Sequence, residues 1–197
     1  MNLNPYIYSQ NLMQKAEMET FKQEDSFRVM QKAAKTCFNF LIDIVSNQRI
    51  LVVCGPGNNG GDGILIAKYL HDKQKNVELY AALGMAQTND SKNALALLHS
   101  NFPIKQSVNF KDYDIIIDSV FGVGLNRPIT EELQILFRNL NNSQSIVISI
   151  DMPSGVLTDT GQVNSVAIKA DTTLTFCLLY TSPSPRDATL SRMPSSA

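Results

Sequence analysis

Several features that mark particular protein classes are missing from this 197-residue sequence. Its net charge is only −1 and the sequence contains no cluster of basic residues, so a nucleic-acid partner is not expected. No stretch reaches the roughly 20 apolar residues that cross a bilayer, and the opening MNLNPYIYSQN lacks the basic patch and apolar run of a secretion signal. The three cysteines form no CxxC pair, which favours reduced, buried thiols over zinc or redox chemistry. We therefore expect a cytoplasmic protein without membrane contacts.

What the sequence does contain is a regular alternation of short apolar runs and helix-compatible segments. The runs are rich in β-branched residues and cover 50–54, 77–83, 114–118, 146–150 and 172–176. Helix-compatible segments lie at 63–71, 89–100 and 130–140, and a long amphipathic stretch over 10–45 precedes the first run. This alternation predicts an α/β fold in which a mostly parallel central sheet is covered on both faces and the N-terminal helical region packs on it.

The C-terminal segment differs from the rest of the chain. Residues 177–197, CLLYTSPSPRDATLSRMPSSA, are rich in serine and proline and show no periodicity. We expect one domain over 1–176 and an irregular, non-native or disordered tail over 177–197. A truncated or chimeric reading frame would explain the change in composition.

Three loops with unusual chemistry follow strands of the predicted sheet and should therefore meet at one edge. They are GPGNNGGDG at 55–63, DSVFGVGLNRP at 118–128 and DMPSGVLTDTG at 151–161. Glycines let the first loop approach a ligand closely, and the helix expected to start near Asp62 adds N–H groups and a positive dipole end that suit a pyrophosphate. The loop lacks the lysine and hydroxyl of a Walker A motif, and its GxGxxG spacing is weak evidence alone. A nucleotide-like ligand is expected without triphosphate hydrolysis.

Polar side chains in these loops are candidates for catalysis and ion binding. Asp118 and Asp151 end neighbouring strands. Because nearby carboxylates repel unless a proton or cation lies between them, at least one of the two is expected to be functional. Asn59, Asp118 and Ser154 would together supply oxygens for a hard cation. A monovalent ion is favoured over magnesium because only one of these three residues is charged.

Other polar residues leave alternatives open. The pair Asn58 and Asn59 is expected to contact a ligand or ion, although asparagines also shape turns. Asp62 could contact the ligand or simply cap its helix. Arg127 offers a fork of donors that matches phosphate, or it could form a surface ion pair.

Four motifs in order, GPGNNGGDG, DSVFGVGLNRP, SIDMPSGVLTDTG and IKADTTLTF, resemble the YjeF N-terminal domain family, the NAD(P)HX epimerases. The resemblance covers roughly 14–176, although the segment FRVMQKAAKTC matches only loosely. It implies a three-layer Rossmann-like sandwich. It also implies an isomerase that interconverts the R and S forms of hydrated NADH and NADPH, a repair of damaged nucleotides.

The resemblance also implies roles for individual residues. Asp151 would face the altered ring, and because epimerisation needs protons delivered and removed, we take it as the catalytic acid–base. One potassium ion per subunit would bind Asn59, Asp118 and Ser154. The family's substrate-binding positions fall on Asn58, Asn59, Gly60, Gly61, Asp62, Gly122, Val123, Gly124, Leu125, Asn126, Arg127, Pro128 and Asp151.

The sequence also suggests partners and leaves alternative functions open. Relatives suggest a kinase-like NAD(P)HX dehydratase domain, fused or separate, and a homodimer. The main alternative is a non-catalytic adenosine- or nucleotide-binding module that acts as a scaffold. A weaker alternative is a sugar-nucleotide or phosphate-sugar enzyme on the same sheet. The intact pair Asp118 and Asp151 favours an enzyme over a scaffold.

Overall fold

The structure is a computed structural model that describes residues 24–125, 129–163 and 165–175. Within these residues six strands form one sheet in the order β3-β2-β1-β4-β5-β6, and all neighbouring strands are parallel. The strands are β1 (Ile50–Cys54), β2 (Val77–Ala81), β3 (Ile104–Lys105), β4 (Ile115–Ser119), β5 (Ile146–Ile150) and β6 (Thr172–Leu174). This is the strand order of a doubly wound, dinucleotide-binding sheet.

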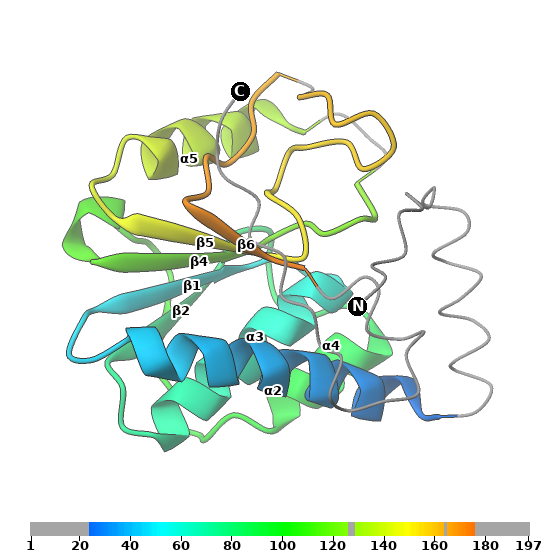
Figure 1. The fold of residues 1–197 in the computed structure, drawn as a ribbon, viewed down its shortest axis with the longest axis vertical. Coiled ribbons are helices and arrows are strands. Elements are labelled where there is room, and N and C mark those ends of the chain that lie inside the picture. The colour runs from blue at the N-terminus through cyan, green and yellow to red at the C-terminus, as the bar shows by residue number, and fades with distance from the viewer. Residues whose placement is uncertain (1–23, 126–128, 164, 176–197) are drawn as a thin grey trace, which may run out of the picture.

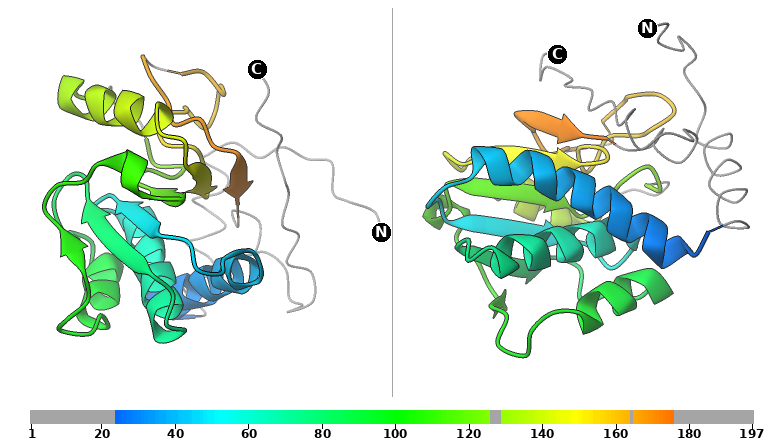
Figure 2. Two further views of the ribbon diagram at one scale, coloured as in Figure 1. Left: turned by 90° about the vertical axis from the view of Figure 1, so that its left-hand side faces the viewer. Right: turned by 60° about the horizontal axis from the view of Figure 1, so that its bottom comes forward.

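Helices cover both faces of the sheet (Figure 1). On one face lie α2 (Ser26–Ile44), α3 (Asn58–Asp72) and α4 (Asn89–Ala96), and on the other lies α5 (Glu131–Asn141). A 3-10 turn, η1 (Phe110–Asp112), precedes β4. The left view in Figure 2 shows the same separation of α5 from the other helices. The predicted three-layer α/β sandwich is therefore confirmed.

Two hydrophobic cores account for this layering. Successive strand side chains point to opposite faces, so Ile50 and Val52 pack toward α2 and α3, whereas Leu51 and Val53 pack toward α5. All five residues of β1 are buried. Strands buried on both faces need continuous apolar runs, and such runs predicted these strands from the sequence.

The N-terminal amphipathic region forms α2 from Ser26, because the Asp25 side chain caps the helix by accepting a hydrogen bond from the Arg28 N–H at 3.0 Å. Most of the apolar residues that recur at helical spacing are buried as expected, namely Met30, Ala34, Cys37, Phe38 and Leu41. Ile44 is an exception at 46 % exposed, because the helix ends there. The earlier part of the predicted helical region, 10–23, lies outside the described residues, as does the tail 177–197.

One predicted helix start was wrong, and one short strand was not predicted. The helix expected to start near Asp62 begins at Asn58, with Gly57 as its N-cap, so Asp62 lies inside the helix and does not cap it. The two-residue strand β3 was not predicted at all. No helix among the described residues combines the length and apolar character needed to cross a membrane.

Candidate functional site

The candidate site lies where the chain leaves β1 and β4 toward opposite faces of the sheet. β1 continues into α3 on one face, and β4 leads to α5 on the other (Figure 1). The two connections touch: the Gly55 N–H donates to the Ser119 carbonyl at 3.2 Å, and a Cβ on Gly55 would lie 2.1 Å from the Val120 carbonyl oxygen. In open parallel sheets this switch point is where ligands bind.

The first turn of α3 provides backbone donors at the switch point. The first hydrogen bond of the helix runs from the Gly61 N–H to the Gly57 carbonyl at 3.1 Å. The N–H groups of residues 58–60 consequently have no acceptor within the helix. No acidic side chain occupies this first turn. The helix start thus has the N–H groups on which the predicted anion site depends, four residues earlier than expected.

Glycines bring this helix start into close contact with its surroundings. A Cβ on Gly60 would lie 1.8 Å from the Gly55 carbonyl oxygen, and a Cβ on Gly61 would lie 2.9 Å from the Met30 sulfur. Both positions are buried. Their visible role is packing, and any ligand contact from them would come from the backbone.

Asn58 is held by the start of α4, a link that sequence reasoning missed. Its side-chain oxygen accepts a hydrogen bond from the Thr88 hydroxyl at 2.6 Å. Thr88 also caps α4 by accepting from the Ser91 N–H at 3.2 Å. The Ser91 hydroxyl and the Gln87 N–H both donate to the Pro56 carbonyl, at 3.1 and 2.8 Å. The start of α4 therefore braces the loop after β1.

Asn59 and Asp151 both lie next to Gly122, and we call these three residues the rim. A Cβ on Gly122 would lie 2.5 Å from Asp151 Oδ2 and 3.3 Å from Asn59 Cγ. Asp151 Oδ2 accepts a hydrogen bond from the Val123 N–H at 3.0 Å. The Asn59 carboxamide is buried and has no hydrogen-bond partner among the residues that the structure describes. A buried amide without hydrogen-bond partners favours binding of a ligand or ion, because a buried polar group that makes no hydrogen bond costs free energy.

Asp151 combines a buried carboxyl with an unusual backbone conformation. Burial raises the pKa of its carboxyl above the usual value, opposed by the hydrogen bond from the Val123 N–H. Its backbone has φ +68°, a left-handed conformation that non-glycine residues rarely adopt. Near it, burial and then the charges of Asp62 and Asp151 raise the pKa of the Cys37 thiol, so this thiol stays protonated and unreactive.

Asp118 joins the ends of β4 and β5. Its carboxylate accepts hydrogen bonds from the Ser149 hydroxyl at 2.8 Å, the Ser154 N–H at 2.9 Å, the Ser154 hydroxyl at 2.6 Å and the Val120 N–H at 3.2 Å. It is fully buried, and burial raises its pKa while these hydrogen bonds oppose the rise. Ser149 was not predicted, although a serine within an apolar buried strand signals a polar contact.

Other predicted substrate positions in the loop after β4 differ in their surroundings. The Val123 carbonyl accepts from the Thr158 hydroxyl at 3.2 Å, which ties the loop after β4 to the loop after β5. Leu125 is buried in the core that packs on α5, so its side chain does not line the rim. Asn126, Arg127 and Pro128 lie outside the described residues, and their roles stay predictions.

Replacing Gly122 by alanine should damage the site without damaging the fold. The new Cβ would enter the space between Asp151 and Asn59, whereas the backbone of Gly122 is not left-handed and accepts a side chain. We expect at least a tenfold loss of ligand affinity or turnover, roughly the effect of a misplaced catalytic group. Ser100→Ala is the control, because Ser100 is exposed and lies outside the three loops of the candidate site. Equal activity of the two variants, measured on proteins with equal melting temperatures, would contradict this geometry.

Comparison with known proteins identifies relatives for most of the chain. A family model described as "YjeF-related protein N-terminus" matches residues 26–181. The chain is 38% identical over 159 residues to the bifunctional NAD(P)H-hydrate repair enzyme Nnr of Dictyoglomus turgidum, a match that covers 76% of this chain and 31% of that protein. It is 37% identical over 131 residues to an NAD(P)H-hydrate epimerase of Limosilactobacillus fermentum, covering 65% of this chain and 63% of that protein.

A third relative and one solved structure complete the comparison. An NAD(P)H-hydrate epimerase of Levilactobacillus brevis is 35% identical over 152 residues, covering 75% of this chain and 70% of that protein. The crystal structure of a yeast protein superposes with a TM-score of 0.76 at 20% identity and covers 86% of this chain and 79% of the other, which shows that the two share a fold. The chain spans less than two thirds of the length of the first two relatives.

Proposed function

Because the chain belongs to the YjeF-related protein N-terminus family, we propose that it is an NAD(P)H-hydrate epimerase, which interconverts the R and S forms of hydrated NADH and NADPH. The observation that carries the proposal is the rim formed by Asn59, Gly122 and Asp151 beside the anion-binding start of α3. Two relatives named NAD(P)H-hydrate epimerase, at 37% and 35% identity, support it, as does a relative at 38% identity that is named an NAD(P)H-hydrate repair enzyme.

In this proposal the helix start and the rim bind different parts of the substrate. The N–H groups of residues 58–60 would hold the pyrophosphate. The ring would then lie along the rim, where Asp151 reaches its hydrated carbon. If the hydroxyl leaves, protonated Asp151 gives it a proton as the C–O bond breaks. After the ring has turned its other face toward Asp151, the resulting carboxylate removes a proton from the water that adds to that face. If the ring opens and closes instead, the same carboxyl delivers and removes the protons. A raised pKa suits either route.

A monovalent cation, potassium in our proposal, would bind between Asn59, Asp118 and Ser154. The oxygen of Asn59 fits such an ion, because it is buried and has no hydrogen-bond partner in the described part of the chain. The Ser154 hydroxyl can donate to Asp118 Oδ1 at 2.6 Å or to the Phe121 carbonyl at 3.3 Å. Turned toward Phe121, it leaves both its own oxygen and Asp118 Oδ1 available to the ion. When bound, the ion supplies fixed positive charge near the substrate. A single carboxylate then balances a single positive charge.

Removal of potassium tests this part of the proposal. We expect a higher melting temperature in potassium chloride than in choline chloride of equal ionic strength, because an ion that binds only the folded state stabilises it. Asn59→Ala should abolish the difference, and Ser100→Ala should preserve it. Stronger stabilisation by magnesium than by potassium would contradict a monovalent site, and identical melting curves in both salts would contradict any site.

The activity itself is tested by following one epimer of hydrated NADH with the full chain and separating the R and S forms by chromatography. We expect equilibration much faster than without protein. If adenosine-containing nucleotides bind but the epimer ratio follows the uncatalysed rate, the chain is a binding module instead. Parallel assays with hydrated NADH and hydrated NADPH would establish which form is preferred.

Partners and location belong to the same proposal. The match covers 31% of the bifunctional repair enzyme, so we propose a kinase-like dehydratase domain, fused or separate, as the partner that completes repair. A homodimer remains part of the proposal, and so does a cytoplasmic location, where damaged nicotinamide nucleotides would be encountered.

A further inference from the structure

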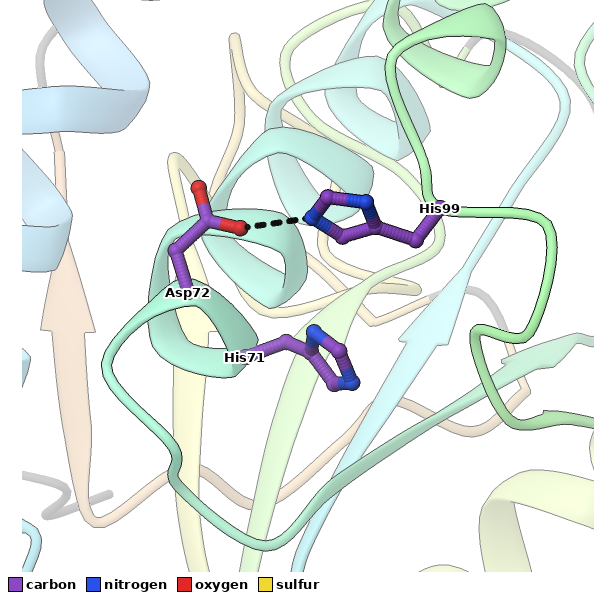
Figure 3. Close-up of side chains that lie close together, drawn as sticks. All are labelled: His71, Asp72 and His99. Carbon is purple, nitrogen blue, oxygen red and sulfur yellow. Dashed lines mark hydrogen bonds and ion pairs between the residues drawn. The ribbon is translucent and has the colours of Figure 1, made fainter.

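A second cluster of functional side chains lies at the opposite end of α3 from the rim. Asn59 and Asp72 are separated by thirteen positions of one helix, or about 20 Å at 1.5 Å per residue. His71 and Asp72 occupy the last turn of α3, and His99 follows α4. Figure 3 shows His99 reaching toward Asp72 while His71 projects from the same helical turn. These are the two histidines of the entire chain, brought together from distant positions.

The ligand atoms of this cluster have the spacing of a metal site. One nitrogen from each histidine and one Asp72 oxygen lie within 4.8 Å of one another. Asp72 Oδ1 and His99 Nε2 are 3.2 Å apart, close to the roughly 3.3 Å between neighbouring ligands of a tetrahedral zinc ion with bonds of about 2.0–2.1 Å. One ligand atom of His71 lies within 4.8 Å of one from each partner, so a small rotation of its ring would be needed to reach this spacing. We propose that His71, Asp72 and His99 bind a divalent transition metal of the zinc type.

The surroundings of the cluster position its members. Asp72 uses Oδ2 to bind the Lys68 ammonium at 2.6 Å, which leaves Oδ1 facing His99. The His71 ring packs on Phe102 with centroids 5.0 Å apart. The Phe102 N–H donates to the His99 carbonyl at 2.9 Å, which fixes the turn that carries His99. The negative end of the α3 dipole further favours a cation.

The donor set determines which metal fits. Two imidazole nitrogens and one carboxylate suit zinc, cobalt, nickel and copper ions, whereas magnesium and calcium prefer oxygen ligands. Three protein ligands leave a fourth position for water. Since Lys68 already balances part of the Asp72 charge, the affinity should be modest. A bound ion would tie the end of α3 to the segment after α4.

The test uses the full chain without an affinity tag and with Cys177→Ser. Cys177 lies outside the described residues, and the substitution prevents its thiol from binding the metal. The other two cysteines, Cys37 and Cys54, are buried. Titration of the metal-free protein with Co²⁺ should give one equivalent of tetrahedral visible absorption, which Zn²⁺ displaces. Zn²⁺ should also shift the ring signals of both histidines in NMR spectra. His71→Gln and His99→Gln should each weaken Zn²⁺ binding by about tenfold or more.

Asp43→Asn is the matched control, since Asp43 is an exposed carboxylate near the end of α2, and it should bind as the parent does. Equal affinity in the parent and His99→Gln, or no absorption from the parent with Co²⁺, would overturn the assignment. Epimerase activity plays no part in these measurements, so the result is independent of the proposed function.

Discussion

Asp151→Asn should slow epimerisation about 10²-fold or more while nucleotide binding is retained. Asparagine keeps an oxygen that can accept the Val123 N–H, and it tolerates the left-handed backbone at this position, so the rim should keep its shape. What it cannot do is release and recover a proton. The measurement is turnover of hydrated NADH together with the dissociation constant of an unreactive nucleotide.

Asp171→Asn provides the control for this substitution. Asp171 also accepts a backbone N–H, from Val147 at 2.8 Å, but it precedes β6 at the other edge of the sheet. It should leave the rate unchanged. Unchanged turnover in Asp151→Asn would remove Asp151 from the chemistry, and loss of nucleotide binding together with turnover would point to a role in binding instead.

The same substitution should stabilise the protein at neutral pH. Burial raises the folded-state pKa of Asp151, so below the unfolded-state value of about 3.9 both states hold the proton and no cost arises. As the pH rises from there through the folded-state pKa, the wild type loses stability because its unfolded state releases the proton more readily than the buried carboxyl does. Asp151→Asn lacks this loss, so its advantage in melting temperature should grow over that range and then level off. A variant that is slower and more stable is the pattern expected of a strained functional residue.

The sheet was predictable because the central strands are buried on both faces. The bounds 50–54 and 146–150 match β1 and β5, since apolar β-branched runs end there at glycine or aspartate. β3 contains only Ile104 and Lys105, neither of them buried, and two residues carry no periodic pattern. The start of α3 was misplaced for a different reason. Glycine-rich sequence has low helix propensity, but the close packing of Gly60 on Gly55 stabilises a helix there.

The meeting of Asp118 and Asp151 at one edge of the sheet followed from strand polarity alone. Their different environments did not. Asp118 accepts four hydrogen bonds in a sealed site, whereas Asp151 lies on the rim beside Gly122 and Asn59. The contact between Asn58 and Thr88 was equally invisible, because a cap and an asparagine thirty positions apart leave no local signal. Sequence therefore placed these residues at one edge of the sheet, and only tertiary contacts distinguish the hydrogen-bonded Asp118 from Asp151 beside Gly122.

Asp118→Ala should cost about 3–5 kcal/mol of unfolding free energy, the range for breaking a buried, hydrogen-bonded charge. Alanine would leave the Val120 N–H, the Ser154 N–H and the hydroxyls of Ser149 and Ser154 without the acceptor that joins the ends of β4 and β5. A domain of this size has about 5–15 kcal/mol in total, so the variant should be close to unfolding at physiological temperature.

Urea unfolding in potassium-free buffer measures this cost separately from any loss of bound ion. Asp114→Ala is the control, because Asp114 immediately precedes the same strand, is exposed, and accepts one hydrogen bond from the Arg49 N–H at 2.7 Å. It should cost no more than about 1.5 kcal/mol. Similar losses in the two variants would mean that the buried network contributes little. A large loss from Asp118→Ala alone would mean that the same carboxylate proposed to hold the cation first holds the two strand ends together, so that ion binding and the fold share one residue.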